Sequence, residues 1–79
     1  MQGAWLHGIY APELNLREAD LSDAILEHAQ MWNAIFLEAK LGYAKFTFAN
    51  LQHADFNGAD LRRAYFGDAD LRWVYFGDA

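Results

Sequence analysis

The sequence predicts an all-β solenoid, which is a coil with flat sides built from five-residue repeats. Thirteen of the fourteen alanines fall in a single phase of a five-residue period. In the unbroken run from Ala19 to Ala69, a large apolar residue follows two positions after each alanine. A strict internal period of this kind indicates a repeat architecture. We therefore interpret the chain as one stack of short, equivalent units.

An α-helix is the main alternative, because residues 17–40 are rich in Ala, Leu and Glu, which favour helices. A helix turns about 100° per residue, so a five-residue step would rotate successive repeats by roughly 140°. The alanines would then scatter around the cylinder instead of forming one apolar face. A straight strand fails as well, since an odd period would send every second repeat to the opposite face.

One arrangement of the five residues satisfies the pattern. The first and third residues point inward from a short extended segment, the second points outward, and the fourth and fifth turn a corner. Alanine in the first position keeps the interior narrow, and a larger residue in the third position fills it. Successive coils would then stack about 4.8 Å apart, which is the ordinary spacing of neighbouring strands.

In this phase the regular part of the chain reads ADLSD, AILEH, AQMWN, AIFLE, AKLGY, AKFTF, ANLQH, ADFNG, ADLRR, AYFGD, ADLRW and VYFGD. The pattern resembles the pentapeptide repeat family, whose consensus is A-(D/N)-L-x-x, and the resemblance extends from Ala4 to Ala79. It implies a right-handed quadrilateral β-helix with four pentads per coil and just under four coils. Five repeats carry the preferred acidic or amide second residue, namely Asp20, Asn50, Asp55, Asp60 and Asp70.

We expect a single domain over residues 1–79, because a chain of this length holds no more than one. It divides into an irregular N-terminal coil or cap at residues 4–18 and regular repeats over residues 19–78. Another interpretation is a fragment or engineered segment of a longer repeat protein, since the chain stops one residue into a new pentad. No stretch resembles a targeting segment or a membrane span, so a cytoplasmic location is expected.

The expected irregularity of the first coil depends on a few unusual residues. Ile9 and Leu14 occupy the narrow first position, and Ala11 takes the large third position. Pro12 is expected to remove a hydrogen-bond donor from the edge of the coil. Together with Trp5, these residues predict a capped N-terminal end.

With four pentads per coil, residues twenty positions apart stack on one another. From Leu41 onward, Leu and Phe alternate strictly at the third position, which predicts two facing columns of phenylalanine and two of leucine. Stacked rings stabilise a core by about 0.5–1.5 kcal/mol per pair beyond the burial of their area. The third-position columns are Leu6, Leu26, Phe46 and Phe66; Ala11, Met31, Leu51 and Leu71; Leu16, Phe36, Phe56 and Phe76; and Leu21, Leu41 and Leu61.

We predict no catalytic, cofactor-binding or metal-binding residues, and we do not expect an enzyme. The chain has no cysteine and no nucleophile in a recognisable setting. His7, His28 and His53 all occupy outward positions, whereas a metal site needs three or four converging ligands. A packed solenoid also offers no cleft that could separate the pKa values of paired carboxylates.

The net charge of the chain indicates whether it could bind or mimic a nucleic acid. Six Lys plus Arg against eleven Asp plus Glu give a net charge of −5, which disfavours direct nucleic-acid binding. The resemblance offers an alternative, because some family members implicated in quinolone resistance are thought to mimic DNA and to bind the type II topoisomerase gyrase. DNA carries one charge per about 1.7 Å, so a mimic roughly 18 Å long would need about ten negative charges. This chain has about half that number.

The leading hypothesis is a non-enzymatic β-helical scaffold or protein–protein interaction module that self-associates. Several large apolar residues lie at outward positions, and contiguous exposed apolar area usually marks a contact surface. The candidate outward surface comprises Trp5, Ile25, Phe48, Tyr65, Ile35 and Leu37. The last coil is predicted to join two copies in a two-fold symmetric homodimer, since a solenoid end exposes a cut core. Its candidate interface comprises Phe66, Leu71, Trp73, Val74, Tyr75 and Phe76.

Overall fold

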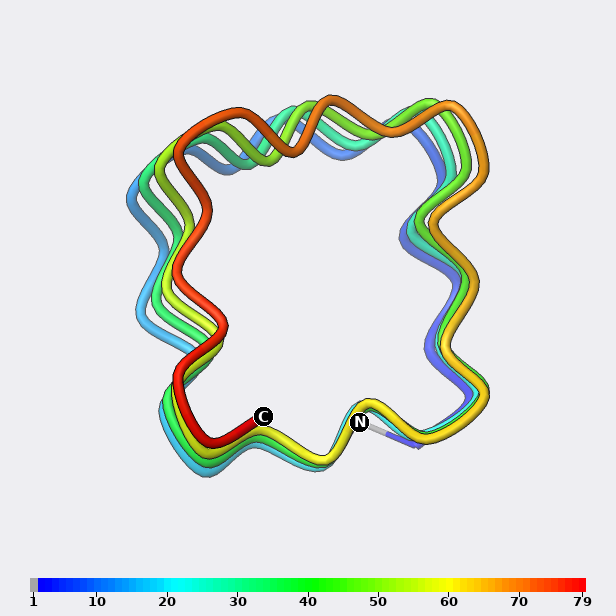
Figure 1. Ribbon diagram of the computed structural model, residues 1–79. Coiled ribbons are helices and arrows are strands. Elements are labelled where there is room, and N and C mark those ends of the chain that lie inside the picture. The colour runs from blue at the N-terminus through cyan, green and yellow to red at the C-terminus, as the bar shows by residue number, and fades with distance from the viewer. Residues whose placement is uncertain (1) are drawn as a thin grey trace.

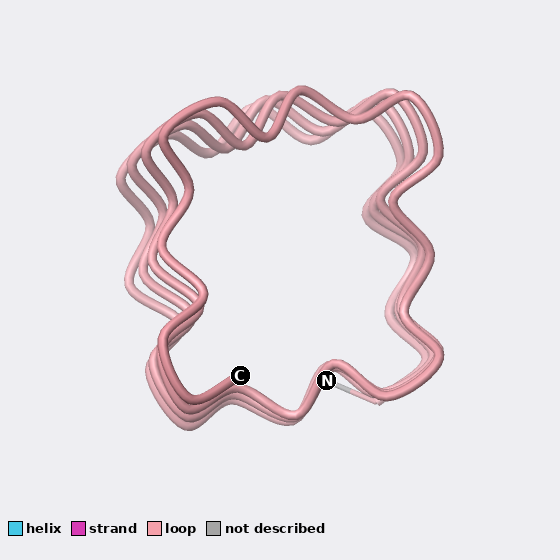
Figure 2. Ribbon diagram, in the orientation of Figure 1, coloured by secondary structure: helices cyan, strands magenta, loops and turns pink. Residues whose placement is uncertain are grey.

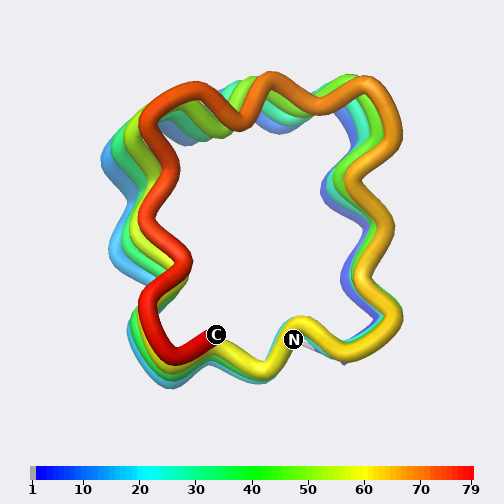
Figure 3. Tube along the Cα trace, viewed as in Figure 1, coloured from blue at the N-terminus to red at the C-terminus, as the bar shows by residue number. Residues whose placement is uncertain are grey.

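Four flat sides and four corners make up each coil of the chain (Figure 1). The structure is a computed structural model that describes residues 2–79. The chain runs anticlockwise as it comes toward the viewer, which is the sense of a right-handed coil (Figure 3). We number the faces by their first pentads, which are 4–8, 9–13, 14–18 and 19–23; each face recurs every twenty residues.

The β-structure consists of isolated bridges rather than strands. Each bridge is parallel and joins second-position residues twenty apart, from Trp5 and Ile25 to Asp55 and Tyr75. This register agrees with the expected four pentads per coil. No helix and no strand longer than one residue occurs in residues 2–79, so the ribbon is drawn as loop throughout (Figure 2). The extended segments are therefore shorter than the strands of most β-helices. Two residues of every five turn the corner, and only one residue in each pentad forms a bridge.

In pentads that have a coil on each side, three of the five backbone N–H groups donate hydrogen bonds to neighbouring coils. We call this set of bonds between coils the ladder. The third and fifth donate to the following coil, as Leu26 does to the carbonyl of Lys45 at 2.7 Å. The second donates to the preceding coil, as Ile25 does to the carbonyl of Ala4 at 2.8 Å. The first donates within its own turn, as Ala29 does to the carbonyl of Leu26 at 3.1 Å. The ladder thus has a direction along the stack.

The fourth N–H is the exception, because no backbone carbonyl in residues 2–79 accepts from it. Where the second residue is Asn or Asp, its side chain accepts that N–H instead, which forms an Asx turn. Distances are 3.0–3.2 Å for the six pairs Asn15–Arg17, Asp20–Ser22, Asn50–Gln52, Asp55–Asn57, Asp60–Arg62 and Asp70–Arg72. The preference for Asn or Asp at the second position therefore has a local cause.

This hydrogen-bond pattern also corrects the expected role of Pro12. Proline lacks an N–H, but the fourth position contributes no N–H to the ladder between coils. Its second-position neighbour is Tyr10, which offers no side-chain acceptor of the Asx kind. Pro12 therefore removes no bond from the edge of the stack.

The fifth residue of each pentad turns the corner in the left-handed region of backbone space. Gly3, Gly8 and Gly58 adopt φ values of 69–72° there. Thirteen other residues, including the bulky Phe48 and Trp73, adopt φ values of 56–63°. An L-residue in this conformation costs roughly 1–2 kcal/mol. The ladder must offset that strain at nearly every corner.

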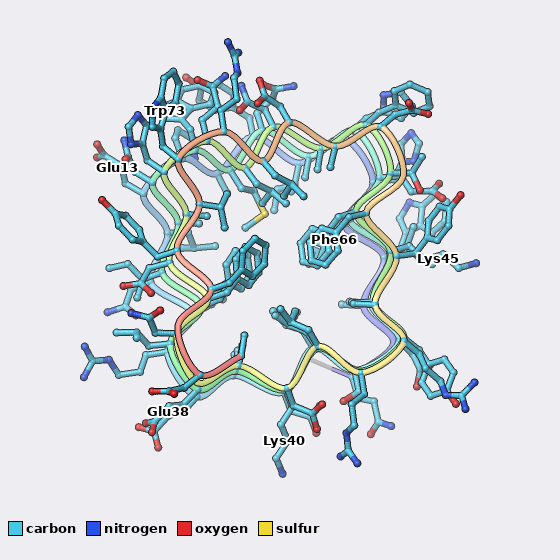
Figure 4. The ribbon with its side chains drawn as sticks, viewed as in Figure 1. Glu13, Glu38, Lys40, Lys45, Phe66 and Trp73 are labelled. Carbon is cyan, nitrogen blue, oxygen red and sulfur yellow. The ribbon has the colours of Figure 1, made fainter. Side chains whose placement is uncertain are left out.

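The core lies inside the coil and is apolar throughout. Phe36 stacks on Phe56 at 4.6 Å between centroids with parallel planes, and Phe46 stacks on Phe66 at 5.0 Å. The two columns meet edge to face at 5.9 Å, as Phe36 and Phe46 do. Figure 4 shows the two ring stacks facing each other from opposite sides. The predicted inward columns are confirmed, and the residues that are fully buried or nearly so all lie between Leu21 and Ala59.

The backbone of the first coil differs from the expected irregular cap, because it repeats the pattern of later coils. Trp5 and Tyr10 pair with the second coil by the usual parallel bridges. Both side chains are exposed and do not cover the end of the core. Ile9 and Leu14 fit the narrow first position because no layer of core lies beneath them; Ile9 is half-buried and Leu14 is exposed.

Candidate interaction surfaces

An exposed row of aromatic rings crosses the first face toward its corner with the second. Trp5 stacks on His7 at 5.5 Å, His7 meets His28 at 5.3 Å with tilted planes, and His28 stacks on Phe48 at 5.1 Å. We call Trp5, His7, His28 and Phe48 the aromatic stripe. Trp5 is 73% exposed and Phe48 is 53% exposed, so two large rings lie in water. The stripe is a continuous row of contacting rings across three coils.

The backbone repeat explains this row of rings. His28 and Phe48 are fifth-position residues twenty apart, so the ladder places one ring above the other. His7 comes from the neighbouring fourth position, and its Nδ1 lies 3.8 Å from Oε1 of Glu27. The outward position of these histidines agrees with the sequence prediction, but their contacts with Trp5 and Phe48 were not predicted. Reading the fifth-position column at a spacing of twenty would have revealed the contact.

The other residues of the expected outward surface divide between two faces. On the first face, the bridges place Ile25 beside Trp5 and Lys45 between Ile25 and Tyr65. The ring of Tyr65 lies across Gly67, where an added Cβ would come within 2.8 Å of it. Ile25 is half-buried and Tyr65 is exposed.

Ile35 and Leu37 lie on the third face, away from that group, and both are half-buried. The apolar surface with the most exposed area among the candidates is therefore on the first face. It extends from the aromatic stripe to Tyr65, with Lys45 as a break.

The second face carries a polar network beside aromatic groups. Arg72 donates two hydrogen bonds to Asp70, at 2.9 and 2.7 Å, and Gln52 donates a third at 2.9 Å. These bonds, led by those from Arg72, lower the pKa of Asp70 to about 2. The guanidinium also lies 5.5 Å from the ring centre of Trp73, which stacks on His53 at 5.0 Å. The contacts fix these side chains in place.

The fourth face contains a groove of about 610 Å³. Asp20, Lys40 and Asp60 form a second-position column of alternating charge along it. Arg62 donates to Asp60 at 3.0 and 2.8 Å, which lowers the pKa of Asp60 to about 2. Gly42 lies in the fourth position between Ser22 and Arg62, so the centre of that column has no side chain.

The last coil leaves part of the core uncovered. Phe76 is 41% exposed, and Phe66, Leu71 and Val74 are half-buried. Trp73 and Tyr75 are exposed at the rim of this layer. The third- and fifth-position N–H groups of this coil, including those of Phe66, Leu71 and Phe76, donate to no backbone carbonyl. This side of the stack therefore presents apolar side chains and backbone donors together.

Charged groups are spread over all four faces. Within residues 2–79, no group of three or more His, Cys, Asp or Glu side chains could hold a metal ion. The described part of the chain also contains no helix able to cross a membrane. Two of the eleven acidic residues, Asp60 and Asp70, are paired with arginines, which weakens the field that a DNA mimic would need.

Three solved structures similar to this one are pentapeptide repeat proteins. HetL from the cyanobacterium Nostoc sp. strain PCC 7120, which is involved in heterocyst differentiation regulation, is 28% identical with a TM-score of 0.62. The match covers 99% of this chain and 38% of HetL, so the chain spans less than half of that protein. Rfr23 from Cyanothece 51142 is 16% identical, with a TM-score of 0.48 and coverage of 94% and 88%. A protein of the Arabidopsis thaliana thylakoid lumen is 21% identical, with a TM-score of 0.45 and coverage of 92% and 65%.

Sequence comparison gives the family directly. No curated protein sequence matches the chain. The family model for pentapeptide repeats matches eight copies, over residues 15–47 and 39–78. Together those matches span residues 15–78, which is most of the chain. The chain belongs to the pentapeptide repeat family.

Proposed function

We propose that the chain is a non-enzymatic protein-interaction module, a right-handed quadrilateral β-helix that presents a fixed surface to a protein partner. The observation that carries the proposal is the aromatic stripe. Outward positions of the coil accept any side chain, yet Trp5 and Phe48 expose large rings there. Exposed aromatic groups that are already held in place bind with little further loss of side-chain entropy, and such groups dominate protein interfaces. A regulatory role, as described for HetL, would suit such a module.

The stripe can be tested by replacing both exposed rings with serine, as Trp5→Ser with Phe48→Ser. The wild-type protein is used to capture a partner from a lysate, and the purified partner is then titrated calorimetrically. We expect the double variant to lose binding, and the wild-type complex to form with a negative heat-capacity change as apolar area is buried. Lys45→Gln, a matched outward change on the same face, is expected to retain binding. Equal affinity of the wild type and the double variant would contradict the proposal.

We also propose that the 79-residue chain forms a homodimer through its last coil. Phe76 leaves a large apolar area in water, and burial of such area favours association. A two-fold axis would set the two last coils antiparallel, whereas every bridge within the stack is parallel, so the ladder would not continue in the same register across the joint. The contact would instead be made by side chains, with Phe76 at its centre and Trp73 or Tyr75 at its rim.

Light scattering on the 79-residue protein tests the dimer. We expect twice the chain mass for the wild type and for Phe48→Ser, and the mass of one chain for Phe76→Asp. A wild type that is monomeric at high micromolar concentration would contradict this proposal. So would a dimer that Phe76→Asp leaves unchanged. Because Phe48 lies one coil before the last and its side chain points outward rather than into the uncovered core layer, the two experiments separate the dimer contact from the aromatic stripe.

A further inference from the structure

The groove on the fourth face contains a glycine that the backbone does not require. Among the six glycines, Gly3, Gly8 and Gly58 occupy left-handed corners. Gly67 and Gly77 lie under neighbouring side chains, where an added Cβ would come within 2.8 Å of another atom. Gly42 has neither constraint, because its φ is not positive and an added Cβ would meet only the carbonyl of Arg62 at 3.6 Å. What Gly42 does provide is an open floor in the groove.

Only one wall of the groove carries charges of opposite sign at its two ends; on the opposite wall both ends are acidic, and Asp60 at one of them is paired with Arg62. The fifth-position column runs from Asp23 through Tyr43 to Arg63, with the guanidinium 5.9 Å from the ring centre of Tyr43. The opposite wall holds Lys40, which Figure 4 shows extending outward from the coil. In the described part of the chain, no salt bridge engages Asp23, Lys40 or Arg63. Their charges are therefore available to a ligand.

We propose that this groove binds an extended peptide segment carrying a basic and an acidic side chain two residues apart. The basic group would meet Asp23 and Asp20, the acidic group would meet Arg63 and Lys40, and the residue between them would lie against Tyr43 above Gly42. Asp23 and Arg63 are two coils apart, which is about 9.6 Å at the usual strand spacing. Alternate residues of an extended peptide are separated by about 6.8 Å, and flexible side chains span the remainder. The site goes beyond the proposed function, because it lies on another face and recognises charge.

The probes are three end-capped peptides that differ only in the charges of their second and fourth residues: Gly-Lys-Ala-Glu-Gly, Gly-Lys-Ala-Lys-Gly and Gly-Glu-Ala-Glu-Gly. Each is titrated into the 79-residue protein while backbone amide shifts are followed by NMR. We expect the mixed-charge peptide to shift amides of residues 20–23, 40–43 and 60–63. It should bind about fivefold tighter than either like-charged peptide, since one favourable exposed ion pair is replaced in each of them.

Gly42→Leu should fill the groove and remove the shifts without harming the fold, because its Cβ has room and its φ is ordinary. Arg63→Gln should weaken the mixed-charge peptide but strengthen Gly-Lys-Ala-Lys-Gly slightly, because a like-charge contact is removed, whereas Lys45→Gln on the first face should change nothing. Equal binding of the three peptides would overturn the proposal. So would shifts centred on another face, unchanged binding by Gly42→Leu, or no shifts at millimolar peptide. None of these outcomes depends on Trp5 or Phe48, so the proposed function is tested separately.

Discussion

Phe56 and Phe76 occupy the same position of the same column, one coil apart, yet their surroundings differ. Phe56 is fully buried, with Phe36 stacked at 4.6 Å on one side and Phe76 at 5.5 Å on the other. Phe76 has a neighbour in its column on one side only and is 41% exposed. The backbone geometry of the two pentads is the same. The contribution of a repeat therefore depends on the coils that cover it more than on its own sequence.

Central and end coils also differ in the residues that occupy the narrow first position. On the third face this column reads Leu14, Ala34, Ala54 and Val74. The two alanines are fully buried, whereas Leu14 is exposed and Val74 is half-buried. Larger residues thus occur only in the end coils, where one side of the layer is open. Central coils require the alanine, and end coils do not.

The largest expected effect separates Phe56 from Phe76. Phe56→Ala should lower the free energy of unfolding by about 3–5 kcal/mol, because it removes a ring from the middle of a closed stack. Phe76→Ala should cost only about 1–2 kcal/mol, since much of that ring is already in water. Urea unfolding at a concentration where the chain is monomeric measures both. Equal costs would show that the last coil is covered in solution.

A smaller effect is expected when a side chain at the narrow first position is enlarged rather than shortened. Ala54→Leu should destabilise the protein by about 1–3 kcal/mol through overpacking of a closed layer. Val74→Leu enlarges the same column by one carbon rather than three, in an open layer, and should cost at most about 1 kcal/mol. Thermal unfolding of the two variants is sufficient to compare them. If Val74→Leu were the more harmful, the distinction between central and end coils would fail.

The smallest effect is the loss of stability at low pH. It is confined to residues 60–79, which no further coil covers and which contain both aspartate–arginine pairs. Pairing lowers the pKa of Asp60 and Asp70 from 3.8 to about 2 in the folded state. Their stabilisation is therefore present above pH 4 and is lost as the pH falls toward 2. Hydrogen exchange should show the last coil opening before the central coils over that range. The double variant Arg62→Gln with Arg72→Gln should flatten this dependence, and an unchanged dependence would assign it to other groups.

The interior could be predicted from the sequence because its signal is strict. The phase of the alanines and the column of rings at Phe36, Phe56 and Phe76 follow from a period of five and a step of twenty. The corner conformation was missed, although Gly, Asn, Asp and His are common at the fifth position. Phe48 and Trp73 obscured that preference, because bulky residues seldom adopt a positive φ.

The outer surface could be predicted only in part, because contacts there depend on side-chain choices at two neighbouring positions. The stacking of His7 on Trp5 joins the fourth and second positions, a relation that no single column contains. The groove depends on the missing side chain at Gly42, which a pattern of apolar residues does not register. The aromatic stripe and the groove were therefore found only in the structure, whereas the coil that carries them was predicted from the sequence.

The Asx turns have a consequence for the acidity of the protein. Four of the turns use an aspartate, at positions 20, 55, 60 and 70, and in each the acceptor is a side-chain oxygen that an asparagine amide also offers. Replacing all four by asparagine would keep the acceptor of every turn, although not the second oxygen that Asp60 and Asp70 offer to arginine, and would raise the net charge by four, from −5 to −1. Much of the low isoelectric point is therefore a by-product of how each repeat closes its corner. Within this architecture, surface charge is free to drift while the fold stays the same.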